Sequence, residues 1–394
     1  MTTTDPLYTR GFWTAWVIHF TGAMSHAMFV LFPLYVLHLG GDALLIGLLL
    51  GISLAVSVAV RPLVGLLLDR VGRRRVLLWG SALNALSFPP FLLAEHPGPL
   101  LWALTVWHMV LGGALFASYF TYAADVIPSG RRIEGLAIFG VAGMAPNGLA
   151  PALGEVLIAD HGFPALFFSA TAFALVSFAL CALVPPREAG ERPAVHPPPG
   201  GGRTLLSSLL PVLSATILFG AGINAAFFFV APYTRALGLE RAAPFFIAYA
   251  ATTVLLRIFG RRVLGRMGTH RVAIPAFAVF AVGLAGITLF PLPGSMLLAG
   301  MACGAGHGSL FPVLNGLAVT RTAPRLHGTV VSLYTAALDG GAVLGTPLCG
   351  AIARAAGYRT MFAAMAAACL AGIPFMMGDA RRAPVHLGAP GPMS

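Results

Sequence analysis

The sequence predicts an all-α polytopic membrane protein with twelve transmembrane helices in two pseudo-symmetric six-helix bundles. Three observations support this prediction. Of the 394 residues, 58% are hydrophobic and only 9% are charged, whereas an ordinary soluble domain has about 25% charged residues. Long apolar runs recur along the whole chain, and short arginine-rich or Pro-Gly segments separate them. The first half of the chain also repeats in the second half.

Twelve apolar runs are each close to the roughly 20 residues that an α-helix needs to cross a bilayer. Six lie in residues 1–184 and six in residues 205–394, and we expect each set to form one bundle. Residues 185–204 are rich in proline, glycine and charge, which predicts a cytoplasmic linker. The runs are residues 12–37, 43–68, 76–94, 99–124, 134–158, 164–184, 206–234, 243–265, 272–291, 295–319, 328–352 and 359–378.

The arginines predict the orientation in the membrane. All 24 basic residues are arginines; if both termini are cytoplasmic, 18 of them fall in cytoplasmic segments and 4 in outer segments. Arginine-rich loops stay on the cytoplasmic side, so we expect both termini there, in the inner membrane of a bacterium. The formal net charge of +11 lies in gaps between apolar runs and therefore indicates no nucleic-acid partner.

The internal repeat predicts where a binding site lies. A shift of 196 residues superposes Arg61 on Arg257 and Gly72 on Gly268. Parallel six-span repeats related by an axis along the membrane normal are a recurrent transporter design, with the substrate site between the repeats near the midplane. We therefore expect a site between the two halves, at that depth.

A glycine- and arginine-rich segment follows the second apolar run. It reads Gly65-x-x-x-Asp69-Arg70-x-Gly72-Arg73-Arg74-Arg75 and resembles the signature loop of the major facilitator superfamily. The glycines permit a tight turn, and the charges can form a network. In that family the network latches the two halves in the outward-open state. The resemblance therefore implies gating roles for Gly65, Asp69, Arg70, Gly72, Arg73 and Arg74.

Two positions differ from drug-exporting members of the family. The fourth span of those members resembles Arg-x-x-x-Gly, and His108 stands here at the arginine position before Gly112. The fifth span of antiporters resembles Gly-Pro-x-x-Gly-Gly. Here it reads Ala-Pro-Ala-Leu-Gly-Glu from Ala150 to Glu155, so the antiporter pattern is half present and ends in a carboxyl group.

Charged groups within spans are costly and are candidates for function. At 1.5 Å per residue, Asp339 lies about 16 Å and Arg61 about 12 Å from the cytoplasmic ends of their helices. In the family these two spans face each other, which predicts an Arg61–Asp339 ion pair that breaks when Asp339 is protonated or an anion captures Arg61. The alternatives are a snorkelling Arg61 and a purely structural Asp339.

Arg257 has no corresponding carboxyl partner, because Gly143 occupies the position equivalent to Asp339. An unpaired cation in the cavity suits an anionic or zwitterionic substrate, and a structural arginine near the cytoplasmic face is the alternative. Glu155 is expected near the outer surface, where a surface carboxyl is favoured over a proton site.

Several uncharged or titratable groups complete the expected pathway. Histidines near mid-membrane can bind a proton or substrate, although packed structural histidines are common. Asparagines add hydrogen-bonding groups, and tyrosines can form an aromatic wall or simply pack. The expected substrate and proton pathway is His26, Arg61, Asn224, Arg257, His307 and Asp339, with His108, Glu155, Tyr233, Tyr249 and Asn315 as further candidates.

The sequence contains no P-loop, no HExxH or HxxxH grouping and no catalytic constellation, so it predicts neither an enzyme nor a metal site or cofactor. It predicts a monomeric secondary transporter in the lipid bilayer that moves a small organic solute by alternating access. Protons are the expected coupling ion. Export by proton antiport is favoured by the fifth-span pattern and by resemblance to bacterial efflux members. Proton-coupled uptake (symport) of an organic anion and a non-transporting receptor or scaffold are the alternatives.

Overall fold

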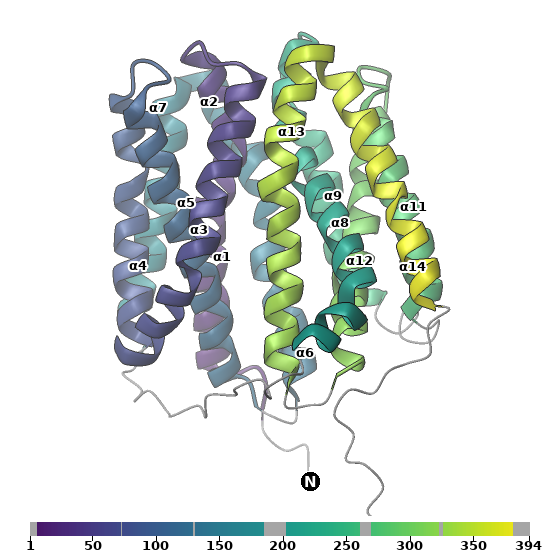
Figure 1. The fold of residues 1–394 in the computed structure, drawn as a ribbon. Helices are drawn as coiled ribbons and strands as arrows, with labels where there is room; N and C mark the ends of the chain where they lie inside the picture. Colours follow the sequence, from purple (N-terminus) through teal and green to yellow (C-terminus); the bar gives the residue numbers. More distant parts are fainter. Residues whose placement is uncertain are drawn as a thin grey trace, which may run out of the picture.

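The computed structural model describes residues 6–71, 73–128, 131–184, 202–260, 269–322 and 326–380, and its regular elements are helices (Figure 1). The first half of the chain forms α1 (Arg10–Ala27), η1 (Met28–Leu31), α2 (Phe32–His38), α3 (Ala43–Val71), α4 (Arg73–Ser87), η2 (Pro89–Leu93), α5 (Pro99–Val126), α6 (Arg132–Met144) and α7 (Pro146–Ala182). The second half forms α8 (Gly202–Ala236), α9 (Ala243–Phe259), α11 (Thr269–Ile287), α12 (Ser295–Thr320), α13 (His327–Leu370) and α14 (Gly372–Ala380). Thus α8 begins inside the predicted linker and includes the last three of its residues.

Two of the apolar stretches are far longer than a membrane is thick. Among the residues that the structure describes, nine stretches could cross a bilayer by length and composition, and two of these, Glu134–Ala182 and His327–Ala380, contain 49 and 54 residues. A straight helix of that length would measure about 75 to 80 Å, against a hydrocarbon core of about 30 Å. Each leaves the helical conformation at one glycine, Gly162 (φ 75°) or Gly357 (φ 84°), a conformation that glycine adopts without strain.

These two glycines therefore divide each long stretch into a hairpin of two spans. Figure 1 shows α13 rising to such a turn, from which the chain descends into α14. Together with the shorter 17-residue apolar helix α9, the described residues form apolar helical segments at the positions of the predicted spans. The count of twelve membrane spans stays a prediction. The predicted all-helical fold is confirmed.

The molecule has two faces on which the helices end. We call the face where α1 and α8 begin the terminal face, at the bottom of Figure 1, and the face with the turns at Gly162 and Gly357 the distal face. The arginine distribution predicts that the terminal face is cytoplasmic. That orientation stays a prediction.

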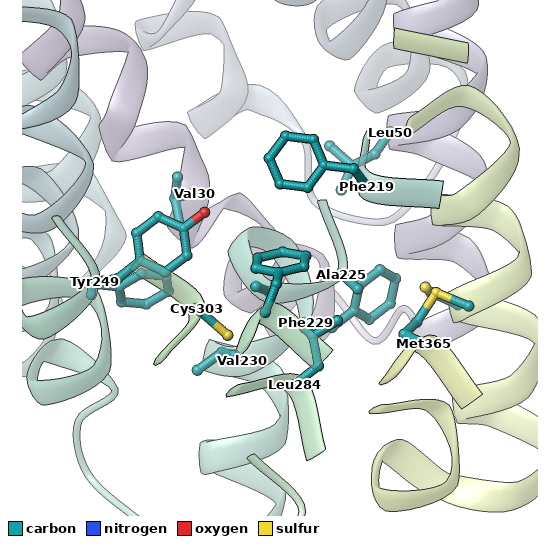
Figure 2. Packing of buried hydrophobic residues seen from close by; sticks show 14 of the residues in the cluster. Val30, Leu50, Phe219, Ala225, Phe229, Val230, Tyr249, Leu284, Cys303 and Met365 are labelled. Carbon is teal, nitrogen blue, oxygen red and sulfur yellow. The ribbon is translucent and has the colours of Figure 1, made fainter. Parts of the chain in front are cut away.

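The two halves share an apolar core on the distal side. One cluster joins Val30 of the first half to Phe229 and Tyr249 of the second (Figure 2). The first-half residues in this cluster come from the distal parts of their helices, whereas a separate cluster around Phe12, Leu77 and others fills the terminal part of the first half alone. Burial of apolar surface thus holds the halves together at the distal face.

Glycines bring the helices of the two halves close together in this region. A Cβ atom on Gly47 of α3 would collide with the carbonyl oxygen of Thr346 on α13. On the other side, a Cβ on Gly148 of α7 would lie only 2.7 Å from the Cβ of Ala250 on α9. Small residues permit such approach between membrane helices. The structure is therefore closed at the distal face.

Adjacent glycines of α13 offer a test of the packing within the second half. A Cβ on Gly341 would collide with the carbonyl oxygen of Ile217 on α8, whereas a Cβ on Gly340 would meet nothing within 4 Å. We expect Gly341→Ala to lower the free energy of unfolding by about 1–3 kcal/mol, because overpacking forces the backbone to move. The matched control Gly340→Ala is expected to have little effect. Reversible unfolding in mixed detergent micelles measures both, and equal effects would contradict this close packing of α13 on α8.

Candidate functional site

An ion pair joins the two halves in the interior of the protein. Arg61 on α3 donates a hydrogen bond from Nη1 to Oδ2 of Asp339 on α13. The two side chains are 32% and 17% exposed, so the pair is partly shielded from solvent. Gly113 of α5 lies beside the arginine, and a Cβ there would make an ordinary contact with Arg61 Nε at 3.8 Å. The ion pair expected from the sequence is present, and its role in transport stays a prediction.

Arg257, the repeat partner of Arg61, is in a different situation. Its Nε and Nη2 atoms are buried and have no hydrogen-bond partner among the described residues. No carboxylate in those ranges is within ion-pair distance of it. Its guanidinium carbon lies 5.2 Å from the ring centroid of Phe311 on α12, a cation–π contact. From the first half, Gly140 faces it, and a Cβ there would lie 3.3 Å from Arg257 Nη1.

Aromatic and amide groups surround this cation. The hydroxyl of Tyr334 on α13 donates to the carbonyl oxygen of Phe311 at 3.0 Å, which ties α13 to α12. The Tyr249 hydroxyl and His307 Nδ1 form a 2.6 Å hydrogen bond between α9 and α12. One turn from Phe311, the buried Oδ1 of Asn315 has no partner among the described residues. The second half thus holds unfilled donors and an unfilled acceptor near one level of α12.

The first half contributes two stacked histidines. The ring of His26 on α1 lies 5.2 Å from the ring of His108 on α5, at an interplanar angle of 16°. Gly112 makes room for His26, since a Cβ there would be 2.5 Å from its Cε1. His26 is exposed although it lies in the middle of a span, whereas Val30, one turn further, is buried in the cluster shared by the halves. His26 therefore lies where the distal packing between the halves ends.

His108 is fully buried and belongs to the interior of the first half. Its Nδ1 lies 3.0 Å from Ser87 Oγ on α4, and its Nε2 has no partner among the described residues. Asn224 uses its amide within its own helix, where Nδ2 donates to the carbonyl oxygen of Gly220 at 2.9 Å. Tyr233 lies apart from the other candidates, packed against rings such as Phe290 at 6.1 Å.

The position of Glu155 differs from the expected surface location. It lies at the distal end of its span, as the sequence predicts, but it is only 7% exposed. Its carboxylate accepts hydrogen bonds from the backbone N–H groups of Ala242 and Ala243 of the second half. The expected surface exposure is wrong because the other half of the protein covers this end of α7.

The predicted gating residues are only partly described. Gly72 and the side chains of Asp69, Arg70 and Arg73 lie outside the described residues, and for Gly65 only its position in α3 is described. Arg74 donates from Nη2 to the carbonyl oxygen of Ala182 at 3.1 Å, which joins α4 to the end of α7 within the first half. The gating roles stay predictions.

Sequence reasoning missed two buried polar groups. His19 on α1 is buried against Phe139, with ring centroids 4.6 Å apart, and its Nδ1 has no partner in the described part of the chain. Asp379 on α14 is fully buried beside Arg321 and His270. For His19, the only sequence signal was its place seven residues before His26 in the same apolar run. For Asp379, the signal was that it is the single carboxyl residue after the last apolar run.

The chemistry available at the centre of the protein is that of ion binding and proton exchange. The buried guanidinium of Arg257 can bind an anion, and the Asp339 carboxylate can exchange Arg61 for a proton. Within the ranges that the structure describes, no group of three or more His, Cys, Asp or Glu side chains is arranged to hold a metal ion.

Comparison with known sequences and structures identifies the relatives of this chain. The sequence model of the Major Facilitator Superfamily matches residues 14–292 and 242–391. An uncharacterised MFS-type transporter of Burkholderia mallei (strain SAVP1) is 27% identical over 351 residues, which cover 85% of this chain and 83% of the relative. Another from Pseudomonas aeruginosa (strain UCBPP-PA14) is 25% identical over 358 residues, covering 87% and 86%.

Solved structures share the fold over nearly the whole chain. A mutant of the nucleoside transporter NupG superposes with a TM-score of 0.80 at 11% identity, covering 94% of this chain and 100% of that one. A bacterial homolog of the human lysosomal transporter Spinster, in an inward-facing and unoccupied conformation, gives 0.74 at 15% identity, with 96% and 98% covered. The human organic anion transporter MFSD10 gives 0.66 at 15% identity, with 94% and 100% covered.

Proposed function

Because the chain belongs to the Major Facilitator Superfamily, we propose that it is a secondary active transporter that carries a small organic anion by alternating access and is driven by protons. Family and fold together make the chain a multi-pass membrane transporter of a small molecule, with no sign of catalytic activity. The anion and the proton are the proposal, and the free edge of Arg257 is the observation that supports it.

The two unpartnered atoms of Arg257 have a specific geometry. Nε and Nη2 form one edge of the planar guanidinium, and this edge binds a carboxylate or phosphate through two parallel hydrogen bonds. A cation buried without a counter-ion is costly in a membrane protein and is a functional candidate by default. A negatively charged group of the substrate would supply the missing acceptors. One structural relative is named an organic anion transporter, but at 15% identity it supports only the fold.

We therefore expect Arg257→Met to weaken the binding of organic anions by about 10- to 100-fold, the equivalent of one or two charge-assisted hydrogen bonds. The same substitution is expected to raise the thermal stability of the empty protein, since it removes an unpaired buried charge. Thermal-shift screening of the purified protein against a library of carboxylates, phosphates and sulfonates measures both effects. If Arg257 were purely structural, its substitution would instead lower the thermal stability of the protein and leave the ligand-induced shift in melting temperature unchanged.

The exposed arginine Arg359 provides the matched control. Arg359→Met removes the same charge from the same half of the protein and is expected to change neither the stability nor the ligand-induced shift. Equal loss of binding in the two variants would indicate a general charge effect and would contradict a specific role for Arg257.

Proton coupling is proposed for the Arg61–Asp339 pair. A proton on Asp339 removes the negative charge that holds Arg61, and the released guanidinium then becomes available to the substrate. Proton and anion bind together in such a cycle, which favours symport. The half-present antiporter pattern around Pro151 favours export by antiport, the second candidate.

Transport in proteoliposomes separates these directions. An organic anion found in the screen is supplied radiolabelled, with the pH gradient imposed in either direction. Symport predicts accumulation on the alkaline side of the membrane, whereas antiport predicts accumulation on the acidic side. A protein that acts only as a receptor or scaffold gives no flux under either gradient.

A further inference from the structure

A carboxylate of the first half caps a helix of the second half at the distal face. Glu155 Oε1 accepts a hydrogen bond from Ala242 N at 2.7 Å, and Oε2 accepts one from Ala243 N at 2.8 Å. Glu155 belongs to α7, and the two N–H groups lie at the start of α9. These are hydrogen bonds between the two halves whose relative movement alternating access requires.

Helix α9 lacks the groups that normally satisfy its first N–H donors. The first four N–H groups of a helix have no partner within it. The N-cap position of α9 is Ala242, which offers no side-chain acceptor, and there is no acidic residue in its first turn. A carboxylate at this end is also stabilised by the helix dipole. Glu155 therefore supplies in trans both the cap and the negative charge that α9 does not have.

The surroundings make this contact difficult to replace by water. Glu155 is 7% exposed. Beside it is a small cavity to which Leu34, Thr234, Arg235 and Glu240 also contribute. The charged groups that face the carboxylate are Arg235, Arg241 and Glu240, all from the second half. Hydrogen bonds to a charged group contribute most where solvent is excluded.

A second contact occupies the pseudo-symmetric position. At the start of α3, Asp42 Oδ1 accepts a hydrogen bond from Leu45 N at 2.8 Å, and Oδ2 lies 3.3 Å from Arg354 Nε on α13. The side chains of Arg354 and Asp42 are 59% and 49% exposed. An ion pair so exposed contributes little, because water and salt screen it. Of the two contacts, only that of Glu155 is buried.

We propose that Glu155 and the N-terminus of α9 form the principal clasp of the distal gate, so that this contact determines how often the protein opens at its distal face. The proposal rests on alternating access, since opening requires α9 to separate from α7. Separation exposes the carboxylate and the two N–H groups together. If the carboxylate is removed, those N–H groups are buried and unpaired in the closed state, whereas they are exposed in the open state. The substitution therefore destabilises the closed state relative to the open one.

The distance between spin labels on the two halves tests the clasp. Glu95→Cys and Thr360→Cys place labels on exposed distal turns of the first and second half. The four native cysteines are buried and should react little. We expect Glu155→Ala to raise the ratio of distal-open to distal-closed molecules by about ten- to hundredfold. The isosteric Glu155→Gln is expected to act in the same direction, because its amide NH₂ faces an N–H donor.

Two controls belong to this experiment. Asp160→Asn removes an exposed carboxyl from the same helix, and Asp42→Asn removes the carboxylate of the exposed pair; each is expected to change the ratio less than twofold. The clasp is refuted if both Glu155 variants also stay within twofold of the wild type. If organic anions still produce a distal-open population in those variants, the transport proposal stands without the clasp. If no open population appears in any protein, the clasp is equally refuted, and the flux assay decides the proposed function.

Discussion

The Asp339→Asn variant is expected to lose proton-driven accumulation of substrate while it retains exchange of substrate down its own gradient. Asparagine keeps the size and one oxygen acceptor for Arg61, but it neither binds nor releases a proton near neutral pH. If Asp339 is the residue at which the proton enters the cycle, accumulation under a pH gradient falls to the level of liposomes without a gradient. Counterflow with labelled substrate then continues, because the binding groups on α9 are intact.

A double variant separates this role from structural support. Asp339→Leu alone leaves Arg61 without its partner, and breaking a buried pair costs about 3–5 kcal/mol, an upper bound here because Arg61 is 32% exposed. The double variant Arg61→Met/Asp339→Leu is expected to recover most of the stability and none of the proton coupling. Asp160→Asn, an exposed carboxyl, is the control. Gradient-driven accumulation that persists in Asp339→Asn contradicts the proposed coupling role.

The Arg61–Asp339 pair was predictable because helix geometry alone determines its depth. Each residue can be counted from a recognisable end of its span at 1.5 Å per residue, and the resemblance to a known family places the two spans opposite each other. The lack of a carboxylate partner for Arg257 was predictable from the repeat. Gly143 occupies the position equivalent to Asp339, so the second arginine has no corresponding carboxylate. Spacing along the helices therefore predicts the depth of these charges, and the family resemblance predicts which of them meet across the two halves.

The partner of Glu155 was not predictable in this way. Its carboxylate oxygens accept hydrogen bonds from the backbone N–H groups of Ala242 and Ala243. Every residue except proline has a backbone N–H group, so the sequence does not indicate which of these groups will bind a carboxylate. The contact also exists only when the two halves are closed at the distal face, which is a property of a conformation rather than of a sequence. The stacking of His26 on His108 depends likewise on the rotation of two helices about their axes, which apolar runs of low amphipathicity do not specify.

The cluster at Asp379 was missed because its members lie beyond the ends of the apolar runs. Counted from hydropathy, Arg321 and Asp379 fall in cytoplasmic segments, where charges are ordinary. The structure instead buries Asp379 completely and leaves Arg321 13% exposed. Hydropathy marks where a membrane span ends, but it does not indicate which flanking charges are covered by neighbouring helices.

Replacing Asp379 is expected to have the largest effect on stability of any single change discussed above. Both carboxylate oxygens accept hydrogen bonds from Arg321, and Oδ2 also lies 2.8 Å from His270 Nε2. Arg321 further donates to the carbonyl oxygen of Ser208 at 3.2 Å, so the cluster joins α8, α11, α12 and α14. Asp379→Ala leaves the arginine nearly buried and unpaired, at a cost of about 3–5 kcal/mol in the free energy of unfolding.

Two comparisons distinguish a buried ion pair from a general loss of charge. Asp42→Asn breaks the exposed pair with Arg354 and is expected to cost less than about 1 kcal/mol. The double variant Arg321→Met/Asp379→Leu is expected to recover most of the lost stability, because apolar groups of similar size often replace a buried pair without cost. Reversible unfolding in mixed detergent micelles measures all of these variants. If Asp379→Ala costs no more than Asp42→Asn, solvent reaches this cluster and the pair does not hold the four helices together. If instead the double variant is as unstable as the single one, the hydrogen bonds to Ser208 and His270 contribute more than the charges do.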